Sequence, residues 1–86
     1  MIIKKNLLKR TIGSDTVLIP IGKTILESNG LFMLNELGAF IWDLLPDVKT
    51  EEEICERVLA EYDVSREEAV SDIATFLEQL RKLDII

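Results

Sequence analysis

The strand-like segments of this chain all come before its helix-like segments, and this order limits the folds available to it. Leu7–Ile12 and Thr16–Ile21 are short, rich in branched residues and separated by the turn-forming residues 13–15, so they predict a β-hairpin. A third strand is predicted over Leu31–Leu34, because this short apolar run follows the turn-forming pair Asn29-Gly30. The pattern of residues 23–28 is ambiguous.

Three amphipathic helices are predicted after the strands. The first ends at Pro46, and the third runs to about Leu83. Each begins at a side chain able to cap it, and two have the spacing of a capping box: Asn35, Thr50 with Glu53, and Ser65 with Glu68. Apolar residues recur at helical spacing in each: Leu37, Phe40, Ile41 and Leu44; Ile54, Val58 and Tyr62, with Cys55 and Leu59 beside them; and Val70, Ile73, Leu77 and Leu80, with Ala69, Phe76 and Leu83 beside them.

This order predicts an α+β fold, since strands grouped before helices are typical of that class. We expect a three-stranded antiparallel sheet followed by three helices with the helices on one face. A single domain over residues 1–86 is expected, because 86 residues bury too little surface for two cores. If sequential strands pair, Leu31–Leu34 lies at one edge of the sheet and offers unpaired backbone groups there.

Few side chains in this sequence suit catalysis or metal binding. It has no histidine and one cysteine, Cys55, so no internal disulfide can form and the commonest zinc and iron ligands are missing. Most of the 16 acidic residues lie on predicted helix faces or in first helical turns, where capping and the helix dipole explain them. We therefore expect no enzymatic activity, no cofactor and no metal.

Hydropathy and charge limit the partners of the chain. No apolar run reaches the roughly 18 to 20 residues of a membrane span, and residues 1–10 lack the features of a signal peptide, so a cytoplasmic protein is expected. Residues 1–35 carry five basic and two acidic residues (5 − 2 = +3), whereas residues 36–86 carry five basic and fourteen acidic residues (5 − 14 = −9). An acidic helical half disfavours nucleic acid, which proteins bind largely through lysine and arginine.

An open strand edge beside a broad apolar helix suits peptide binding. A peptide can add as a further strand, with backbone hydrogen bonds to Leu31–Leu34 and apolar contacts beside the third helix. The alternative is that this helix is simply well buried. Trp42, off the main apolar stripe of the first helix, is either a residue that covers the core or part of a binding surface.

Several short motifs follow one another along the chain. They are Phe32-Met33-Leu34, followed directly by Asn35 and a helix with Trp42, then Asp72-Ile73, Phe76-Leu77, Leu80 and Ile85-Ile86. In this order and separation the chain resembles the PqqD-like family, also called recognition elements of ribosomally made, post-translationally modified peptides (RiPPs). The resemblance covers Leu8 to Ile86. Asp84 stands where family members commonly have glycine, and aspartate tolerates the left-handed conformation of a helix C-cap better than most residues.

The resemblance implies a winged helix-turn-helix fold and a role in peptide recognition. Such domains bind the leader segment of a precursor peptide as an added strand between the third strand and third helix, and present it to a modifying enzyme, often a radical S-adenosylmethionine (SAM) protein. The implied peptide-binding residues are Leu31, Phe32, Met33, Leu34, Ala69, Asp72, Ile73 and Phe76. Because alternate strand residues face opposite sides, we expect Phe32 and Leu34, rather than Leu31 and Met33, to face the core.

Two other functions compete with peptide binding. A DNA-binding winged helix has a similar order of elements, but the second and third helices here have few basic residues: Arg57, Arg66, Arg81 and Lys82. A structural dimerisation subunit would pair the open edge with its own copy. We expect a precursor peptide and its modifying enzyme as partners, no nucleic acid, no membrane, and a monomer or homodimer.

Overall fold

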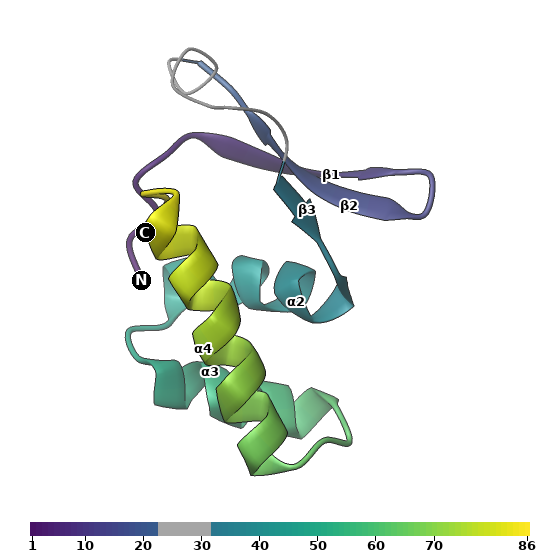
Figure 1. Cartoon of the computed structure of the whole chain (residues 1–86), viewed down its shortest axis with the longest axis vertical. Helices are drawn as coiled ribbons and strands as arrows, with labels where there is room; N and C mark the ends of the chain where they lie inside the picture. Colours follow the sequence, from purple (N-terminus) through teal and green to yellow (C-terminus); the bar gives the residue numbers. More distant parts are fainter. Residues whose placement is uncertain (23–31) are drawn as a thin grey trace.

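The elements of the structure follow the predicted order (Figure 1). The computed structural model describes residues 1–22 and 32–86, so Leu31 and the ambiguous residues 23–28 lie outside the described residues. The described elements are β1 (Leu7–Ile12), β2 (Asp15–Pro20), β3 (Phe32–Leu34), α2 (Glu36–Leu44), the 3₁₀ helix η1 (Leu45–Asp47), α3 (Glu51–Glu61) and α4 (Arg66–Lys82). A three-stranded antiparallel sheet followed by three α-helices is thus confirmed, and the arrangement is compatible with a winged helix-turn-helix.

The β1–β2 hairpin is closed by two loop residues rather than three. Ile12 pairs with Asp15, so Asp15, which the sequence pattern placed in the turn, is the first residue of β2. Gly13, at the first loop position, has a φ of 63°, whereas Ser14 does not have a positive φ. Glycine at that position is typical of a type II′ turn, whose twist matches the twist of the flanking strands. The tighter turn therefore extends the strand to Asp15.

Hydrogen-bonded and non-bonded residue pairs alternate along the β1–β2 ladder. One bond just beyond the strands shows which pairs are bonded. The Ile21 amide donates to the Asn6 carbonyl at 3.0 Å. Because bonded and non-bonded pairs alternate in an antiparallel ladder, the odd-numbered residues of β2 bond to β1 and the even-numbered residues point toward β3. Pro20, opposite Leu7, falls at a non-bonded pair, so its missing N–H removes no bond from this ladder.

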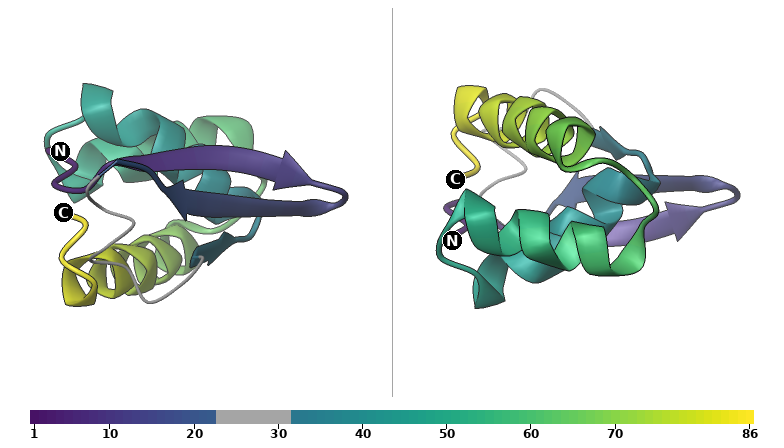
Figure 2. Two further views of the ribbon diagram at one scale, coloured as in Figure 1. Left: turned by 90° about the horizontal axis from the view of Figure 1, so that it is seen from above. Right: turned by 90° about the horizontal axis from the view of Figure 1, so that it is seen from below.

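The core lies between the sheet and the helices, which cover one face of the sheet (Figures 1 and 2). Its fully buried members include Leu18, Ile41, Leu45, Ile54, Val58, Ile73, Leu77 and Leu80. Trp42 is also buried and belongs to the core cluster, which favours the structural interpretation of Trp42 over the binding-surface one. Leu34 is buried and Phe32 half-buried, whereas Met33 is 62% exposed, which confirms the predicted facing of β3.

All three predicted N-caps are present. The capping bonds are Gly38 N–H to Asn35 Oδ1 at 2.7 Å, Glu53 N–H to Thr50 Oγ1 at 3.2 Å and Glu68 N–H to Ser65 Oγ at 3.1 Å. The Glu53 carboxylate also accepts from the Lys49 amide at 3.3 Å, one residue before the position that a capping box uses. These bonds satisfy amides that have no partner inside the helix, so the helices begin where the sequence predicted.

The apolar stripe predicted for α4 is only partly buried. Ile73, Leu77 and Leu80 are fully buried, but Val70 and Leu83 are 50% and 48% exposed. With about 3.6 residues per turn, Val70 and Leu83 lie at opposite margins of the stripe. The prediction that Val70 belongs to the buried part of the stripe is therefore wrong.

Helix α4 ends at a residue with left-handed backbone. Asp84 has a φ of 57°. The Ile85 amide donates to the Leu80 carbonyl at 2.9 Å, and the Asp84 amide donates to the Arg81 carbonyl at 3.0 Å. These are the two bonds of a Schellman motif, in which glycine is the usual left-handed residue. Asp84 therefore supplies the conformation that glycine commonly provides, and its carboxylate pairs with Lys4 at 3.3 Å on the surface.

This C-cap gives a first prediction. Asp84→Gly will be more stable than Asp84→Ala by about 1 kcal/mol, because both variants lose the Lys4 ion pair but only alanine keeps the steric cost of left-handed backbone. Urea unfolding followed by circular dichroism measures the difference in unfolding free energy. Equal stability of the two variants would show that the left-handed residue is not required at this helix end.

Candidate functional site

The outer edge of β3 carries backbone groups that the described sheet does not use. β3 pairs with β2, with Leu18 opposite Phe32 and Thr16 opposite Leu34. Because the even-numbered residues of β2 point toward β3, Phe32 and Leu34 make the bonds of this ladder. Met33 lies between them, so its N–H and C=O point away from the sheet. Among the described residues, Met33 is thus the bonding position of an open strand edge.

Helix α4 lies beside this open edge. Figure 2 (left) shows α4 on the side of β3 that is away from β2. The two elements meet at Phe32 and Phe76, whose rings pack edge to face with their centroids 6.4 Å apart. Gly38 lets α2 approach the same place, since a Cβ there would lie 3.2 Å from the Phe76 ring and 3.6 Å from the Leu34 side chain. Packing around Phe76 therefore fixes the spacing of β3, α2 and α4.

The flank of α4 that faces β3 extends in both directions from Phe76. Of the residues three, four and seven positions from Phe76, three are exposed on this flank: Asp72, Gln79 and Leu83. The other three, Ala69, Ile73 and Leu80, are buried in the core. On the other flank, Arg81 pairs with Glu51 of α3 at 3.3 Å. We call the set Phe32, Met33, Asp72, Phe76, Gln79 and Leu83 the β3–α4 face. Sequence reasoning missed Gln79 and Leu83, although their spacing from Phe76 indicates them.

The predicted peptide-binding residues differ in accessibility. Met33 and Asp72 are exposed and Phe32 is half-buried, whereas Leu34, Ala69, Ile73 and Phe76 are buried. A docked peptide can reach the first group directly. Ala69 and Ile73 are only 1% exposed, so they support the β3–α4 face from below rather than line it. Leu31 lies outside the described residues.

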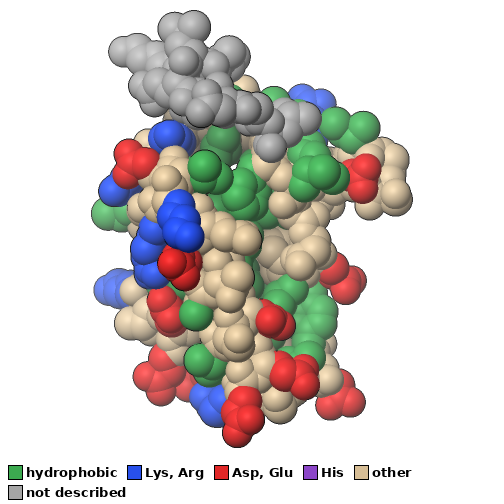
Figure 3. Space-filling model, viewed as in Figure 1, with side chains coloured by type: hydrophobic (Ala, Val, Ile, Leu, Met, Phe, Trp, Pro, Cys, Tyr) green, Lys and Arg blue, Asp and Glu red, His purple; other side chains and the backbone are tan. Residues whose placement is uncertain are grey.

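The end of the β3–α4 face nearest α2 has a negative environment. Phe40 on α2 and Tyr62 after α3 pack edge to face with their ring centroids 5.4 Å apart. Desolvation of Tyr62, followed by the negative charges of Glu36 and Glu61, raises the pKa of Tyr62 above its usual value. Figure 3 shows acidic side chains over much of the helical half of the molecule. A basic side chain would be stabilised at this end.

The described residues offer little that suits other chemistry. They contain no group of three or more Cys, Asp or Glu side chains able to hold a metal ion. Cys55 is buried in the core, where cysteine behaves as a small apolar residue. None of the described helices combines the length and the apolar character needed to cross a membrane. The β3–α4 face instead provides free backbone groups, apolar surface and carboxylates, which suit the binding of an extended chain.

A family match agrees with this geometry. Residues 16–86 match the protein family described as "Coenzyme PQQ synthesis protein D (PqqD)". The chain belongs to the PqqD family. The matched residues include β2 from Thr16 onward, β3 and every helix of the described residues, so the whole β3–α4 face of this PqqD-family chain lies within the match.

Two solved structures are similar to this PqqD-family chain. One, described as "TbiB1 in Complex with the TbiA(beta) Leader Peptide", is 30% identical, with a TM-score of 0.75 over 99% of this chain and 93% of that chain. The other, described as "Lasso peptide synthetase B1 complexed with the leader peptide", is 22% identical, with a TM-score of 0.71 over 93% of this chain and 88% of that chain. Because the second structure is only 22% identical, its similarity to this chain concerns the fold alone. No curated protein sequence matches the chain significantly.

Proposed function

We propose that this PqqD-family chain binds the leader segment of a ribosomally synthesised precursor peptide. The leader adds as a strand to the open edge of β3, beside α4, and is presented there to a modifying enzyme. The observation that carries the proposal is the position of Met33, whose N–H and C=O face outward on the side where α4 lies. Two proteins of similar structure, one of them 30% identical, are seen in complex with leader peptides.

Six of the eight predicted residues are proposed to contact the peptide, together with two further residues of α4: Leu31, Phe32, Met33, Leu34, Asp72 and Phe76, with Gln79 and Leu83. The other two predicted residues, Ala69 and Ile73, are buried and support the β3–α4 face from below. Met33 supplies backbone hydrogen bonds, and the exposed side chains of the β3–α4 face supply selectivity. The chain itself acts as a peptide chaperone without catalysis, and the bond-making chemistry belongs to the modifying enzyme, for which a radical SAM protein is one candidate.

The charge of the helices favours a peptide over DNA. The first two turns of α4 carry one basic residue, Arg66, against three acidic ones, Glu67, Glu68 and Asp72, all exposed, whereas a recognition helix needs an excess of basic groups near DNA. A negative surface also repels the phosphate backbone on which affinity for nucleic acid largely depends. Pairing of β3 with its own copy is the remaining alternative, and it predicts a dimer that a docked peptide dissociates.

Direct titration tests the proposal. Short open reading frames near the gene of this protein are searched for a precursor, and its leader peptide is labelled with a fluorophore. This peptide should bind with a dissociation constant of about 1 μM or tighter, equivalent to about −8 kcal/mol. Fluorescence anisotropy measures the affinity, and a scrambled leader of the same composition is the control. Absence of saturable binding, or equal binding of the scrambled peptide, would contradict leader recognition. Sedimentation velocity of the free protein reports whether a dimer competes for the edge.

A further inference from the structure

Two carboxylates extend the β3–α4 face beyond its apolar centre. Asp72 lies one turn before Phe76 on the same flank of α4, and Glu68 lies one turn before Asp72. Both side chains are exposed. Within the described residues, neither carboxylate takes part in an ion pair or a side-chain hydrogen bond. They are available to a ligand docked beside them.

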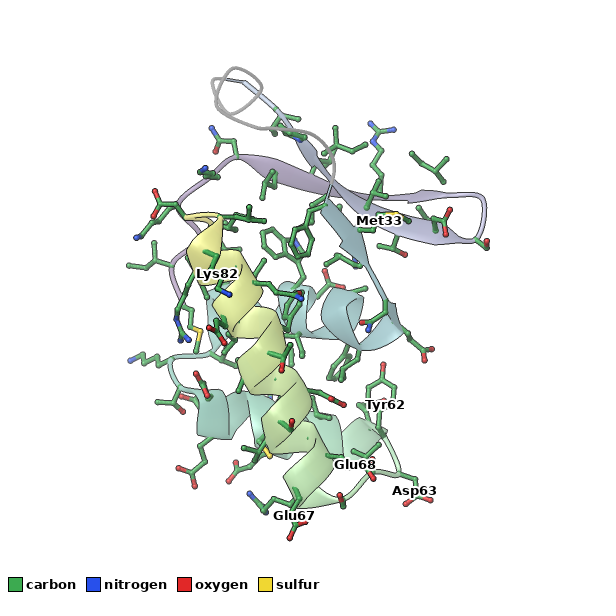
Figure 4. The ribbon with its side chains drawn as sticks, viewed as in Figure 1. Met33, Tyr62, Asp63, Glu67, Glu68 and Lys82 are labelled. Carbon is green, nitrogen blue, oxygen red and sulfur yellow. The ribbon has the colours of Figure 1, made fainter. Side chains whose placement is uncertain are left out.

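Two other carboxylates of the last two helices have ion-pair partners. Glu51 pairs with Arg81 at 3.3 Å, and Glu78 pairs with Lys82 at 3.8 Å. Figure 4 shows Glu68 on the same side of α4 as Tyr62, whereas Lys82 lies at the other end of the helix. Arg66 lies at the Glu68 end of α4, but its guanidinium is directed at the Cys55 sulfur of α3, 3.9 Å away. Within the described residues, no basic side chain of α4 therefore pairs with Glu68 or Asp72.

The two ends of the β3–α4 face differ in polarity. Leu83, seven residues after Phe76, leaves 48% of its surface exposed at the sheet end of α4. At the opposite end, Glu68 lies on the side of α4 where Tyr62 lies (Figure 4), and the charges of Glu36 and Glu61 act on Tyr62. A docked chain meets an apolar side chain near one end and unpaired negative charge near the other.

The direction of an added strand decides which terminus of the peptide lies at which end of the β3–α4 face. Figure 1 shows that β3 and α4 run in opposite directions, with β3 descending toward α2 and α4 rising toward the sheet. Every strand pair in the described sheet is antiparallel, and antiparallel pairing is slightly more stable per residue. A strand added antiparallel to β3 starts near Asp72 and Glu68 and ends near Leu83.

We propose, on the basis of the proposed function, that Asp72 and Glu68 select leader segments with lysine or arginine on the N-terminal side of an apolar, strand-forming stretch. Asp72 and Glu68 precede Phe76 by four and eight residues, or about 6 and 12 Å along a helix. An extended peptide advances about 3.3 Å per residue. The basic residue therefore lies roughly two to four residues before the residue that pairs with Met33.

A randomised peptide library tests this selectivity without knowledge of the natural leader. Twelve-residue peptides displayed on phage are selected on the wild-type protein, on the double variant Glu68→Gln/Asp72→Asn, and on the control Glu67→Gln/Glu78→Gln, which removes two carboxylates from the opposite flank of α4. Wild type and control should enrich peptides with Lys or Arg before the apolar stretch, and the double variant should not. One enriched peptide and its Lys-to-Gln analogue are then titrated against all three proteins.

The titrations measure how much the basic residue of the peptide contributes to affinity. The analogue should bind wild type and control about threefold to tenfold more weakly than the basic peptide, as expected for one or two partly exposed ion pairs. The double variant should bind both peptides equally. Enrichment of apolar peptides without a basic residue, or a basic preference that survives in the double variant, would overturn the proposed selectivity while leaving strand addition intact. Failure of all three proteins to enrich any peptide would refute the proposed function itself.

Discussion

Met33→Pro will weaken leader-peptide binding at least tenfold while the protein remains folded. Proline removes the outward N–H of Met33, and its ring occupies the space that an added strand needs. Loss of one backbone hydrogen bond together with this obstruction corresponds to at least about 1.4 kcal/mol of binding free energy. The sheet tolerates the change because the Met33 N–H makes no bond to β2. We expect the unfolding free energy to fall by less than about 1 kcal/mol.

Two further variants distinguish the loss of the Met33 N–H from the loss of the Met33 side chain and from general destabilisation of β3. Met33→Ala keeps the N–H and should bind the leader within about threefold of wild type if the added strand uses mainly backbone groups. Phe32→Pro removes an N–H that faces β2 and should destabilise the sheet as well as binding. Anisotropy titration and urea unfolding of the same preparations measure both quantities. Wild-type affinity of Met33→Pro would place the docked peptide elsewhere.

Ile73→Ala will lower the unfolding free energy by about 2 to 5 kcal/mol, which is a large part of the stability of a domain this small. Ile73 is 1% exposed and belongs to the core cluster, so removal of its side chain leaves a cavity. Thermal or urea unfolding measures the loss. Once the folded fraction is taken into account, the affinity for leader peptide should change far less than the stability does.

Asp72→Asn is the matched control for Ile73→Ala, since Asp72 is the preceding residue of α4 but is exposed. Its unfolding free energy should stay within about 0.5 kcal/mol of wild type. The two neighbours thus separate a residue that supports the β3–α4 face from one that a peptide contacts. A large stability loss in Asp72→Asn, or a negligible one in Ile73→Ala, would contradict this division.

Much of the fold is predictable because it rests on local chemistry. The bounds of β1 agree with the sequence pattern, and Asn35, Thr50 and Ser65 cap the predicted helices through their own side-chain oxygens. Predictions from local sequence patterns fail where residues outside the segment determine its structure. Asp15 joins β2 because of the twist of the turn, and Val70 is exposed because periodicity defines a stripe but not the neighbours that cover it.

The candidate site was predictable only in part. Alternation along the strand indicated that Met33 faces away from the core, but its free N–H and C=O follow from the strand register and the Ile21–Asn6 bond. Ala69, Ile73 and Asp72 share one short stretch of α4, and only tertiary packing distinguishes the two buried residues from the exposed one. Leu83 belongs to the β3–α4 face because it follows Phe76 by seven residues, or about two helical turns, and so lies on the same flank of α4.

Strand alternation limits what the described part of β3 offers to a chain that lacks matching side chains. Within Phe32–Leu34 one position, Met33, points its N–H and C=O outward, so the sequence-independent bonding there is about two hydrogen bonds, worth roughly 1 to 3 kcal/mol. At these residues an unrelated strand gains little from the backbone alone. Discrimination between a cognate chain and an unrelated one then rests on the side chains of the β3–α4 face.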